Sequence, residues 1–264
     1  MIPFLKWPGG KRWLVQKYSH LFPKTYNRYI EPFLGGGAVY FHMMPDEAIL
    51  SDINNDVITV YSGIQRSHNR FSSLMAEHQK NHSREYYYDV RRAIPDDAIE
   101  RAARVLYLNR VCFNGIYRVN RLGEFNVPIG TKTAVTLPTD DFPAVSRQLQ
   151  KAELHAVDFK STISKAKKDD FLFADPPYTV RHNNNGFIKY NQNLFSWEDQ
   201  VDLSLELIAA KERGVRIVST NANHSSVREL YEGHGFNFTV VNRYSGISAA
   251  SESRRHFEEL VIAS

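Results

Sequence analysis

The sequence contains little cysteine, no long apolar run and neither of the common phosphate-binding motifs. One cysteine, Cys112, and no CxxC pair exclude a disulfide framework and the usual structural zinc sites, and we expect no metal. No stretch approaches the roughly 18 apolar residues of a membrane-spanning helix, and Lys6 and Lys11 stand where a signal peptide would have an apolar core. Neither GxGxxG nor GxxxxGK[ST] occurs, which argues against a dinucleotide or ATP site.

Charge is spread unevenly along a chain that is only mildly basic. The formal net charge is +4 and the sequence pI is near 9.0, values that do not by themselves indicate nucleic acid. Residues 57–130 hold 11 Lys and Arg against 7 Asp and Glu, so this segment alone has a net charge of +4. A basic segment between neutral parts is typical of a module that contacts phosphates. A solvated helical face explains any single cluster, such as Arg91-Arg92, better.

The tetrapeptide Asp175-Pro176-Pro177-Tyr178 follows an apolar run and has the parts needed to alkylate an exocyclic amine. The N6 amine of adenine is a poor nucleophile because its lone pair is delocalised into the ring. A carboxylate and a carbonyl that accept its hydrogens favour the pyramidal nitrogen that attacks, and Asp175 and the Pro176 carbonyl are such acceptors. The prolines stiffen the segment, and Tyr178 offers a ring for stacking. Taken alone, the tetrapeptide fits a strand-ending turn equally well.

A second group of residues, near the N-terminus, indicates a nucleoside ligand without phosphates. A short strand pattern leads into Gly35-Gly36-Gly37, where a ligand can approach the backbone closely. A second strand pattern ends in Asp52, an acid placed to bind ribose hydroxyls. S-adenosylmethionine is the common cofactor of this description, and it supplies the methyl group that an amine attacks. Either feature alone is better explained as a tight turn or a helix N-cap.

Strand and helix patterns alternate at both ends of the chain and flank a helical middle. The composition, 42% hydrophobic, suffices for a full core. Alternation implies an α/β fold with a doubly wound, mainly parallel sheet, whose ligands lie at the carboxyl ends of the strands. We expect strands at 29–31, 48–54, 154–158, 170–175, 215–219, 236–244 and 257–262, helices at 38–44, 56–67, 70–82, 97–108 and 197–214, and a β-hairpin at 117–127.

Taken together and in this order, the segments resemble the Dam-type DNA adenine-N6 methyltransferases, the class alpha or D12 family. The match spans most of the chain, with the cofactor motif first and the catalytic motif last. Pro8 stands where this family often has Ala, and Phe113 stands where Tyr is frequent, which removes a hydroxyl. The segments that carry the resemblance are Phe4 to Lys11, Glu31 to Gly37, Asp52 to Asn54, Leu106 to Arg110 through Gly123 to Pro128, and Asp175 to Tyr178.

The resemblance implies an S-adenosylmethionine-dependent enzyme that acts on double-stranded DNA and releases S-adenosylhomocysteine. It implies a Rossmann-like catalytic domain at 1–56 and 152–264, and an inserted, mainly helical target-recognition domain at 57–151 that carries the hairpin. We expect a cytoplasmic protein of a bacterial or phage-infected cell, monomeric in solution, with room for more than one copy on DNA.

The resemblance also implies roles for individual residues. The expected catalytic residues are Asp175, Pro176, Pro177 and Tyr178. The expected cofactor contacts are Trp7, Lys11, Glu31, Pro32, Phe33, Gly35, Gly36, Gly37, Asp52, Ile53, Asp158, Phe159 and Asp175. The expected DNA contacts are Lys6, Arg110, Phe113, Asn114, Ile116, Arg118, Asn120, Pro128 and Tyr190.

Within the DNA set, the expected tasks differ. Phe113 and Asn114 would fill the gap left by an adenine rotated out of the duplex, and Tyr190 would stack on the extruded base. Ile116 and Arg118 would reach base edges, and a guanidinium is suited to bidentate contact with guanine. A phosphate contact, which carries no sequence information, is the alternative for Arg118. Similar family members act on GATC, which is the leading candidate site.

Other functions account for fewer of these features. An N4-cytosine methyltransferase uses the same amine chemistry, but its tetrapeptide more often begins with Ser, so Asp175 favours adenine. A C5-cytosine enzyme needs a cysteine nucleophile after proline, whereas Cys112 follows Val111. An RNA or protein-glutamine methyltransferase leaves the basic segment unexplained. A catalytically inactive DNA-binding regulator would keep that segment and lose the catalytic carboxylate.

Overall fold

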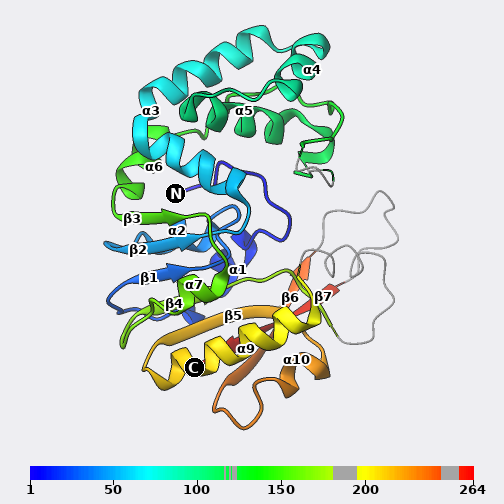
Figure 1. Ribbon diagram of the computed structural model, residues 1–264. Coiled ribbons are helices and arrows are strands. Elements are labelled where there is room, and N and C mark those ends of the chain that lie inside the picture. The colour runs from blue at the N-terminus through cyan, green and yellow to red at the C-terminus, as the bar shows by residue number, and fades with distance from the viewer. Residues whose placement is uncertain (116, 119, 121–123, 181–194, 245–255) are drawn as a thin grey trace. The chain divides into compact units, whose positions relative to one another are not determined.

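The computed structural model divides into two compact units and describes residues 1–115, 117, 118, 120, 124–180, 195–244 and 256–264. Unit 1 comprises Met1–Val15 and Leu34–Ala156, and unit 2 comprises Gln16–Phe33 and Val157–Ser264 (Figure 1). The insertion expected at 57–151 lies within unit 1, and its boundaries stay a prediction.

Unit 1 combines a pair of parallel strands with a group of helices. β2 (Ala48–Ser51) and β3 (Ala152–His155) are parallel, with Leu50 opposite Leu154. α3 (Asn55–Asn81) packs against α5 (Ala98–Val111) and α6 (Phe142–Leu149). The other elements are α2 (Ala38–Met43), α4 (Arg84–Arg92), the 3₁₀ turn η2 (Phe113–Gly115) and α1 (Arg12–Lys17), which runs from unit 1 into unit 2.

Local hydrogen bonds explain where the helices of unit 1 begin. The Asn54 side chain accepts from the Asp56 backbone N–H at 3.0 Å and caps α3. Ser67, with φ −159° and ψ 84°, interrupts this helix, so the two helices predicted at 56–67 and 70–82 form one broken helix. Helix α4 was not predicted; Ser83 caps it by accepting from the Tyr86 N–H at 3.1 Å.

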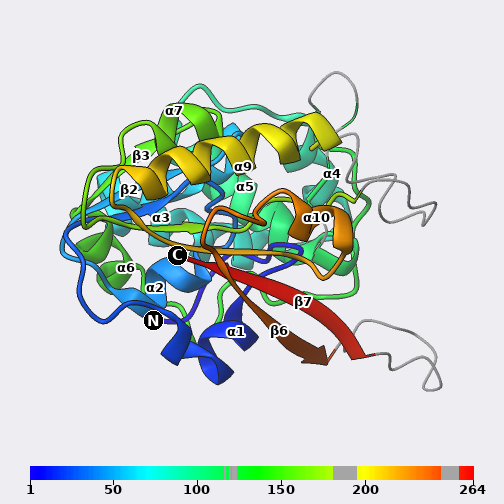
Figure 2. The same cartoon turned by 90° about the horizontal axis from the view of Figure 1, so that it is seen from below.

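Unit 2 contains strands in the order β1-β4-β5-β7-β6. β1 (Tyr29–Glu31), β4 (Phe171–Ala174) and β5 (Arg216–Ala222) are parallel, whereas β7 (His256–Ala263) is antiparallel to both β5 and β6 (Asn237–Tyr244). Figure 2 shows β6 and β7 side by side. The remaining elements are the 3₁₀ turn η1 (Ser19–Leu21), α7 (Phe159–Ile163), α9 (Trp197–Glu212) and α10 (Ser225–Glu229).

The sequence patterns of unit 2 are largely confirmed. All four residues of β4 are buried, as its continuous apolar run predicts. The expected cap of α9 is a complete capping box, in which Ser196 accepts from the Asp199 N–H and Asp199 accepts from the Ser196 N–H. Strands alternate with helices, and parallel pairing occurs in both units, which confirms the α/β class.

Backbone geometry bears on two other sequence predictions. The strand predicted at 154–158 was placed too late: β3 covers Ala152–His155, and Asp158 instead caps α7. The hairpin predicted at 117–127 is supported at its described residues, because the Asn120 N–H donates to the Glu124 carbonyl at 2.8 Å and the Asn126 N–H to the Arg118 carbonyl at 3.3 Å.

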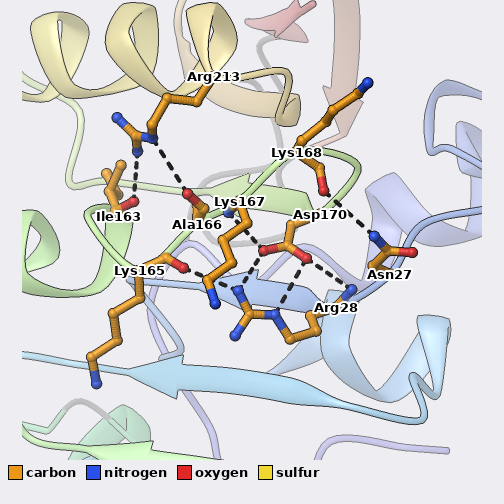
Figure 3. A network of polar contacts seen from close by, with 9 residues as sticks. All are labelled: Asn27, Arg28, Ile163, Lys165, Ala166, Lys167, Lys168, Asp170 and Arg213. Carbon is orange, nitrogen blue, oxygen red and sulfur yellow. Dashed lines mark hydrogen bonds and ion pairs between the residues drawn. The ribbon is translucent and has the colours of Figure 1, made fainter.

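The loop that precedes β4 is fastened by a polar network (Figure 3). Asp170, whose side chain is 2% exposed, accepts from the Arg28 guanidinium at 2.7 Å and from the Lys167 N–H at 2.8 Å. Arg213 donates to the carbonyls of Ile163 and Ala166. These bonds fix the amino end of β4, whose carboxyl end leads into Asp175.

Among the residues that the structure describes, no helix has both the length and the apolar character needed to cross a membrane. Within the same residues, no group of three or more His, Cys, Asp or Glu side chains is placed to hold a metal ion.

Candidate active site

The glycine loop of unit 1 packs closely against aromatic side chains. Gly35 and Gly37 have φ of 45° and 63°, in the left-handed region that favours glycine. A Cβ on Gly35 would lie 2.5 Å from Cδ1 of Trp7, and one on Gly37 would lie 2.8 Å from the Tyr61 hydroxyl. A Cβ on Gly36 would lie 3.3 Å from the Leu5 carbonyl. The close packing of this loop therefore requires glycine at these positions, whether or not a ligand also approaches the backbone there.

Asp52 lies directly after β2 and fastens this loop. One carboxylate oxygen accepts from the Gly35 N–H at 2.9 Å and the other from the Asn54 N–H at 2.9 Å. The residue is 8% exposed, and burial raises the pKa of its carboxyl, an effect that the two backbone donors oppose. A carboxylate has about four acceptor positions, so these two bonds leave capacity for the hydroxyls of a ribose. Ile53, beside it, is 73% exposed.

Trp7 joins the glycine loop to the predicted recognition hairpin. Its ring stacks on Tyr117, with 6.0 Å between centroids and 29° between planes. Tyr117 also contacts Phe125 and donates its hydroxyl to the Asp56 carboxylate. Lys11 is buried, and its ammonium donates to the Gly9 carbonyl at 3.0 Å.

In unit 2, the predicted cofactor residues form an aromatic cluster. Phe33 stacks on Phe159 at 5.6 Å and 25°, and Phe195 packs edge-on against Phe33 at 5.7 Å. Beside them, Glu31 is 2% exposed and accepts from the Tyr29 hydroxyl at 2.8 Å. Pro32 links Glu31 to this cluster.

Asp158 precedes this cluster and caps α7. Its carboxylate accepts from the backbone N–H and the hydroxyl of Ser161, at 3.0 and 2.8 Å. These bonds lower the pKa of Asp158. Its observed bonds are therefore those of a helix cap, and its predicted contact with the cofactor adenine stays a prediction.

The tetrapeptide Asp175 to Tyr178 follows β4 at the carboxyl edge of the unit 2 sheet. Thr220 on β5 donates its hydroxyl to Oδ1 of Asp175 at 2.6 Å. The Tyr178 hydroxyl donates to Oε2 of Glu259 on β7 at 2.7 Å. Burial, Asp175 and Glu259 together raise the pKa of Tyr178 well above its ordinary value, so its hydroxyl stays protonated. Pro176 is buried and Pro177 is half-buried.

Several predicted DNA contacts lie exposed in unit 1. The side chain of Phe113 is 53% exposed, and Asn114 beside it is exposed with φ 57°. Arg118 is exposed, with its Nε donating to Asn126 at 3.0 Å. Asn120 bonds to Glu124 at 2.9 Å, and Pro128 is exposed.

Two of the predicted DNA contacts have internal partners. Arg110 is 1% exposed, and its guanidinium donates to both carboxylate oxygens of Asp140 at 2.6 Å and to the Val135 carbonyl at 2.6 Å. Lys6 is half-buried and donates to the Arg110 carbonyl at 2.9 Å. Because Arg110 is buried and its guanidinium has internal partners, it is not part of the proposed DNA surface. The sequence shows the charge of Arg110 but not its burial. Ile116 and Tyr190 lie outside the described residues.

The geometry adds residues that the sequence did not single out. Thr220, Glu259 and Phe195 each contact a predicted site residue, although they lie far from it along the chain. Strands at 215–219 and 257–262 were predicted from the sequence, but the strand register that brings these residues to the tetrapeptide was not visible there. Cys112 is buried, and burial raises the pKa of its thiol to about 11, which agrees with its exclusion as a nucleophile.

A family model described as D12 class N6 adenine-specific DNA methyltransferase matches residues 7–247, which include both glycine loop and tetrapeptide. The chain belongs to this family. The resemblance found in the sequence is thereby confirmed, and so is the expected enzyme class, an adenine-specific DNA methyltransferase.

Individual relatives agree with this membership of the D12 family. The chain is 34% identical to the type II methyltransferase M1.LlaDCHI of Lactococcus lactis subsp. cremoris, over 98% of this chain and 94% of that protein. It is 34% identical to a DNA adenine methylase of Haemophilus influenzae, over 98% and 92%. It is also 34% identical to a DNA N-6-adenine-methyltransferase of Escherichia phage P1, over 94% of this chain and 33% of that larger protein.

Proposed function

We propose that this D12 methyltransferase transfers the methyl group of S-adenosylmethionine to N6 of an adenine rotated out of duplex DNA, within GATC. The observation that carries this proposal is the tetrapeptide Asp175 to Tyr178, held by two buried side chains at the carboxyl ends of the parallel strands β4 and β5. Family membership supports adenine over the N4-cytosine alternative, and it supports an enzyme over an inactive regulator.

In the proposed mechanism, Asp175 and the Pro176 carbonyl accept hydrogen bonds from the adenine amino group. These acceptors draw the nitrogen lone pair out of conjugation, which stabilises the transition state more than the ground state. Tyr178 stacks on the base. When bound, S-adenosylmethionine would supply the electrophilic methyl group: the N6–C bond would form as the S–C bond breaks, S-adenosylhomocysteine would leave, and N6 would give up one of its two protons.

We propose that the residues around the glycine loop bind the methyl donor. Asp52 has acceptor capacity for ribose hydroxyls, and the packing of Trp7 against Gly35 keeps the loop in one conformation. In unit 1, the further proposed contacts are Lys11 and Ile53. In unit 2, taken by itself, the proposed contacts are Glu31, Pro32, Phe33, Asp158 and Phe159.

Exposed and half-buried residues of unit 1 are the proposed DNA contacts. Phe113 and Asn114 would occupy the gap left by the rotated adenine, and Arg118 would contact a guanine. The proposed surface also includes Lys6, Asn120 and Pro128. We further propose that the protein is a monomer in solution.

The decisive experiment is transfer of a labelled methyl group to duplexes with and without GATC and to RNA of the same sequence. The methylated nucleoside is then identified by mass. We expect N6-methyladenine in the GATC duplex and little label elsewhere. N4-methylcytosine, or equal labelling of RNA, would contradict the proposed substrate, and equal labelling of both duplexes would contradict the proposed site.

A further inference from the structure

Two buried side chains from neighbouring strands hold the catalytic tetrapeptide. Thr220 on β5 is fully buried and donates to Asp175 at 2.6 Å. Glu259 on β7 is 4% exposed and accepts from the Tyr178 hydroxyl at 2.7 Å. Asp175 and Tyr178 are thus both held by side chains of the sheet, and Thr220 also hydrogen-bonds to Tyr178.

The register of the two strands explains why these partners lie together. In the antiparallel pair of β5 and β7, Thr220 is opposite Val261 and Ala222 is opposite Glu259. Side chains two residues apart share a face of a sheet, and directly opposed residues point to the same face. Thr220 and Glu259 therefore emerge on one face, with one residue pair between them, and both contact the tetrapeptide there.

A buried carboxylate is costly unless it receives hydrogen bonds, so the position of Glu259 calls for a donor. Tyr178 is that donor in the structure. The same bond limits rotation of the Tyr178 ring, whose free side chain would exchange between rotamers. A ring fixed in advance does not have to be ordered when a base stacks on it.

We propose that Glu259 and Thr220 are positioning residues for methyl transfer: Glu259 fixes the Tyr178 ring as the surface on which the target adenine stacks, and Thr220 orients the Asp175 carboxylate toward N6. This inference rests on the proposed function, because it assigns partners to the residues that would hold the base. Neither positioning residue needs to touch the substrate.

A double-mutant cycle on the Tyr178 hydroxyl and Glu259 tests the first half. Tyr178→Phe removes the donor and Glu259→Met removes the acceptor at similar volume. We expect each to lower kcat about tenfold, the loss typical when one partner of a buried hydrogen bond is removed. The KM for S-adenosylmethionine should stay unchanged. The double variant should be no slower than the slower single variant, because each single variant already removes the hydrogen bond between Tyr178 and Glu259.

Two further variants separate positioning from folding. Glu259→Gln keeps an acceptor oxygen, so we expect it to restore most of kcat. Glu258→Met is the matched control, since Glu258 is adjacent but exposed and bonds to Asn223 at 2.7 Å. We expect Glu258→Met to keep wild-type kcat. Thermal unfolding of every variant identifies any that is misfolded, and Tyr178→Phe with Glu259→Gln still decides the question if Glu259→Met fails to fold.

The second half is tested at Thr220 with a conservative pair. Thr220→Val removes the hydroxyl at nearly constant shape, and Thr220→Ser keeps it. We expect Thr220→Val to lower kcat about tenfold and Thr220→Ser to keep a kcat close to that of the wild type. Ser204→Ala, which removes a buried hydroxyl from α9, is the control and should keep wild-type kcat.

Stacking of the base is followed directly with 2-aminopurine in place of the target adenine. Weaker fluorescence quenching in Glu259→Met than in wild type would support a displaced Tyr178 ring. Additive losses in the cycle, or equal losses in Glu259→Gln and Glu259→Met, would overturn the inference while the wild type remains active. A wild-type protein that methylates no adenine would instead contradict the proposed function itself.

Discussion

Three aspartates that follow strands have distinct surroundings at the residue scale. Asp52 is buried against backbone donors, and its pKa is raised. Asp158 caps a helix, and its pKa is lowered. Asp175 is the one of these three that accepts from a buried hydroxyl of a neighbouring strand. Its bonding therefore distinguishes Asp175 from the other two carboxylates.

Replacing Asp175 tests the central catalytic assignment. Asp175→Ala should abolish methyl transfer, because it removes the charged acceptor for the adenine amine. DNA affinity should remain within about threefold, since Asp175 carries none of the positive charge that binds phosphates. Turnover and filter binding measure the two effects. Asp202→Ala, an exposed carboxylate on α9, is the control, and near-normal turnover of Asp175→Ala would refute the role assigned.

Arg118 tests the proposed base recognition. Arg118→Ala should cost about 1 to 3 kcal/mol of discrimination at one guanine of the site, because a bidentate contact is lost. Competition between duplexes with single substitutions in GATC measures this. Arg92→Ala, another exposed arginine of unit 1, is the control. A uniform loss of affinity for every sequence would make Arg118 a phosphate contact instead.

At the element scale, strands and helix caps were predictable where a local pattern determines them. The apolar run of β4 and the Ser196 cap of α9 are confirmed. Helix α4 was missed because it is short and mostly polar, although Ser83 marks its start and its polarity varies with the helical period. Thr220 and Glu259 were missed for another reason: strand register, which depends on the whole sheet, brings them to the tetrapeptide.

The network before β4 makes Asp170 important for stability. Asp170→Ala should lower the free energy of unfolding by about 3 kcal/mol, because it removes the carboxylate that pairs with the partly buried Arg28 guanidinium. Asp202→Ala breaks a solvent-exposed pair with Lys160 and should have a clearly smaller effect. Denaturant unfolding measures both, and equal effects would show that burial of the pair adds nothing.

His78 on α3 predicts a loss of stability in acid. It stacks on Tyr107 at 4.7 Å, and burial lowers its pKa to about 4. The unfolded chain gains this proton near pH 6.5 and the folded chain only near pH 4, so stability falls as pH drops through that window. Allowing for partial exposure, we expect about 1 to 2 kcal/mol between pH 7 and 5.

The measurement for His78 is denaturant unfolding at pH 7 and pH 5. His78→Phe keeps the stacking and removes the titration, so its stability should change less between these pH values than that of the wild type. His234→Phe, at an exposed position, is the control. An unchanged pH dependence in His78→Phe would show that other groups cause it.

At the scale of the whole molecule, the net charge of +4 equals the excess of Lys and Arg over Asp and Glu within residues 57–130. Binding that depends on this segment displaces counterions from DNA, so affinity should fall at least about tenfold between 50 and 200 mM salt. Fluorescence anisotropy with a labelled GATC duplex measures this dependence. An affinity independent of salt would contradict a phosphate-contacting role for the segment.

The buried thiol of Cys112 makes the natural chain suitable for site-specific labelling. With a pKa of about 11, this thiol is almost entirely protonated at neutral pH and reacts slowly with maleimide dyes. Cysteines introduced at Ile94 in unit 1 and Leu205 in unit 2, which are 67% and 59% exposed, would therefore take the dyes selectively. Energy transfer between the two dyes would then follow the separation of the units as DNA and the methyl donor are added.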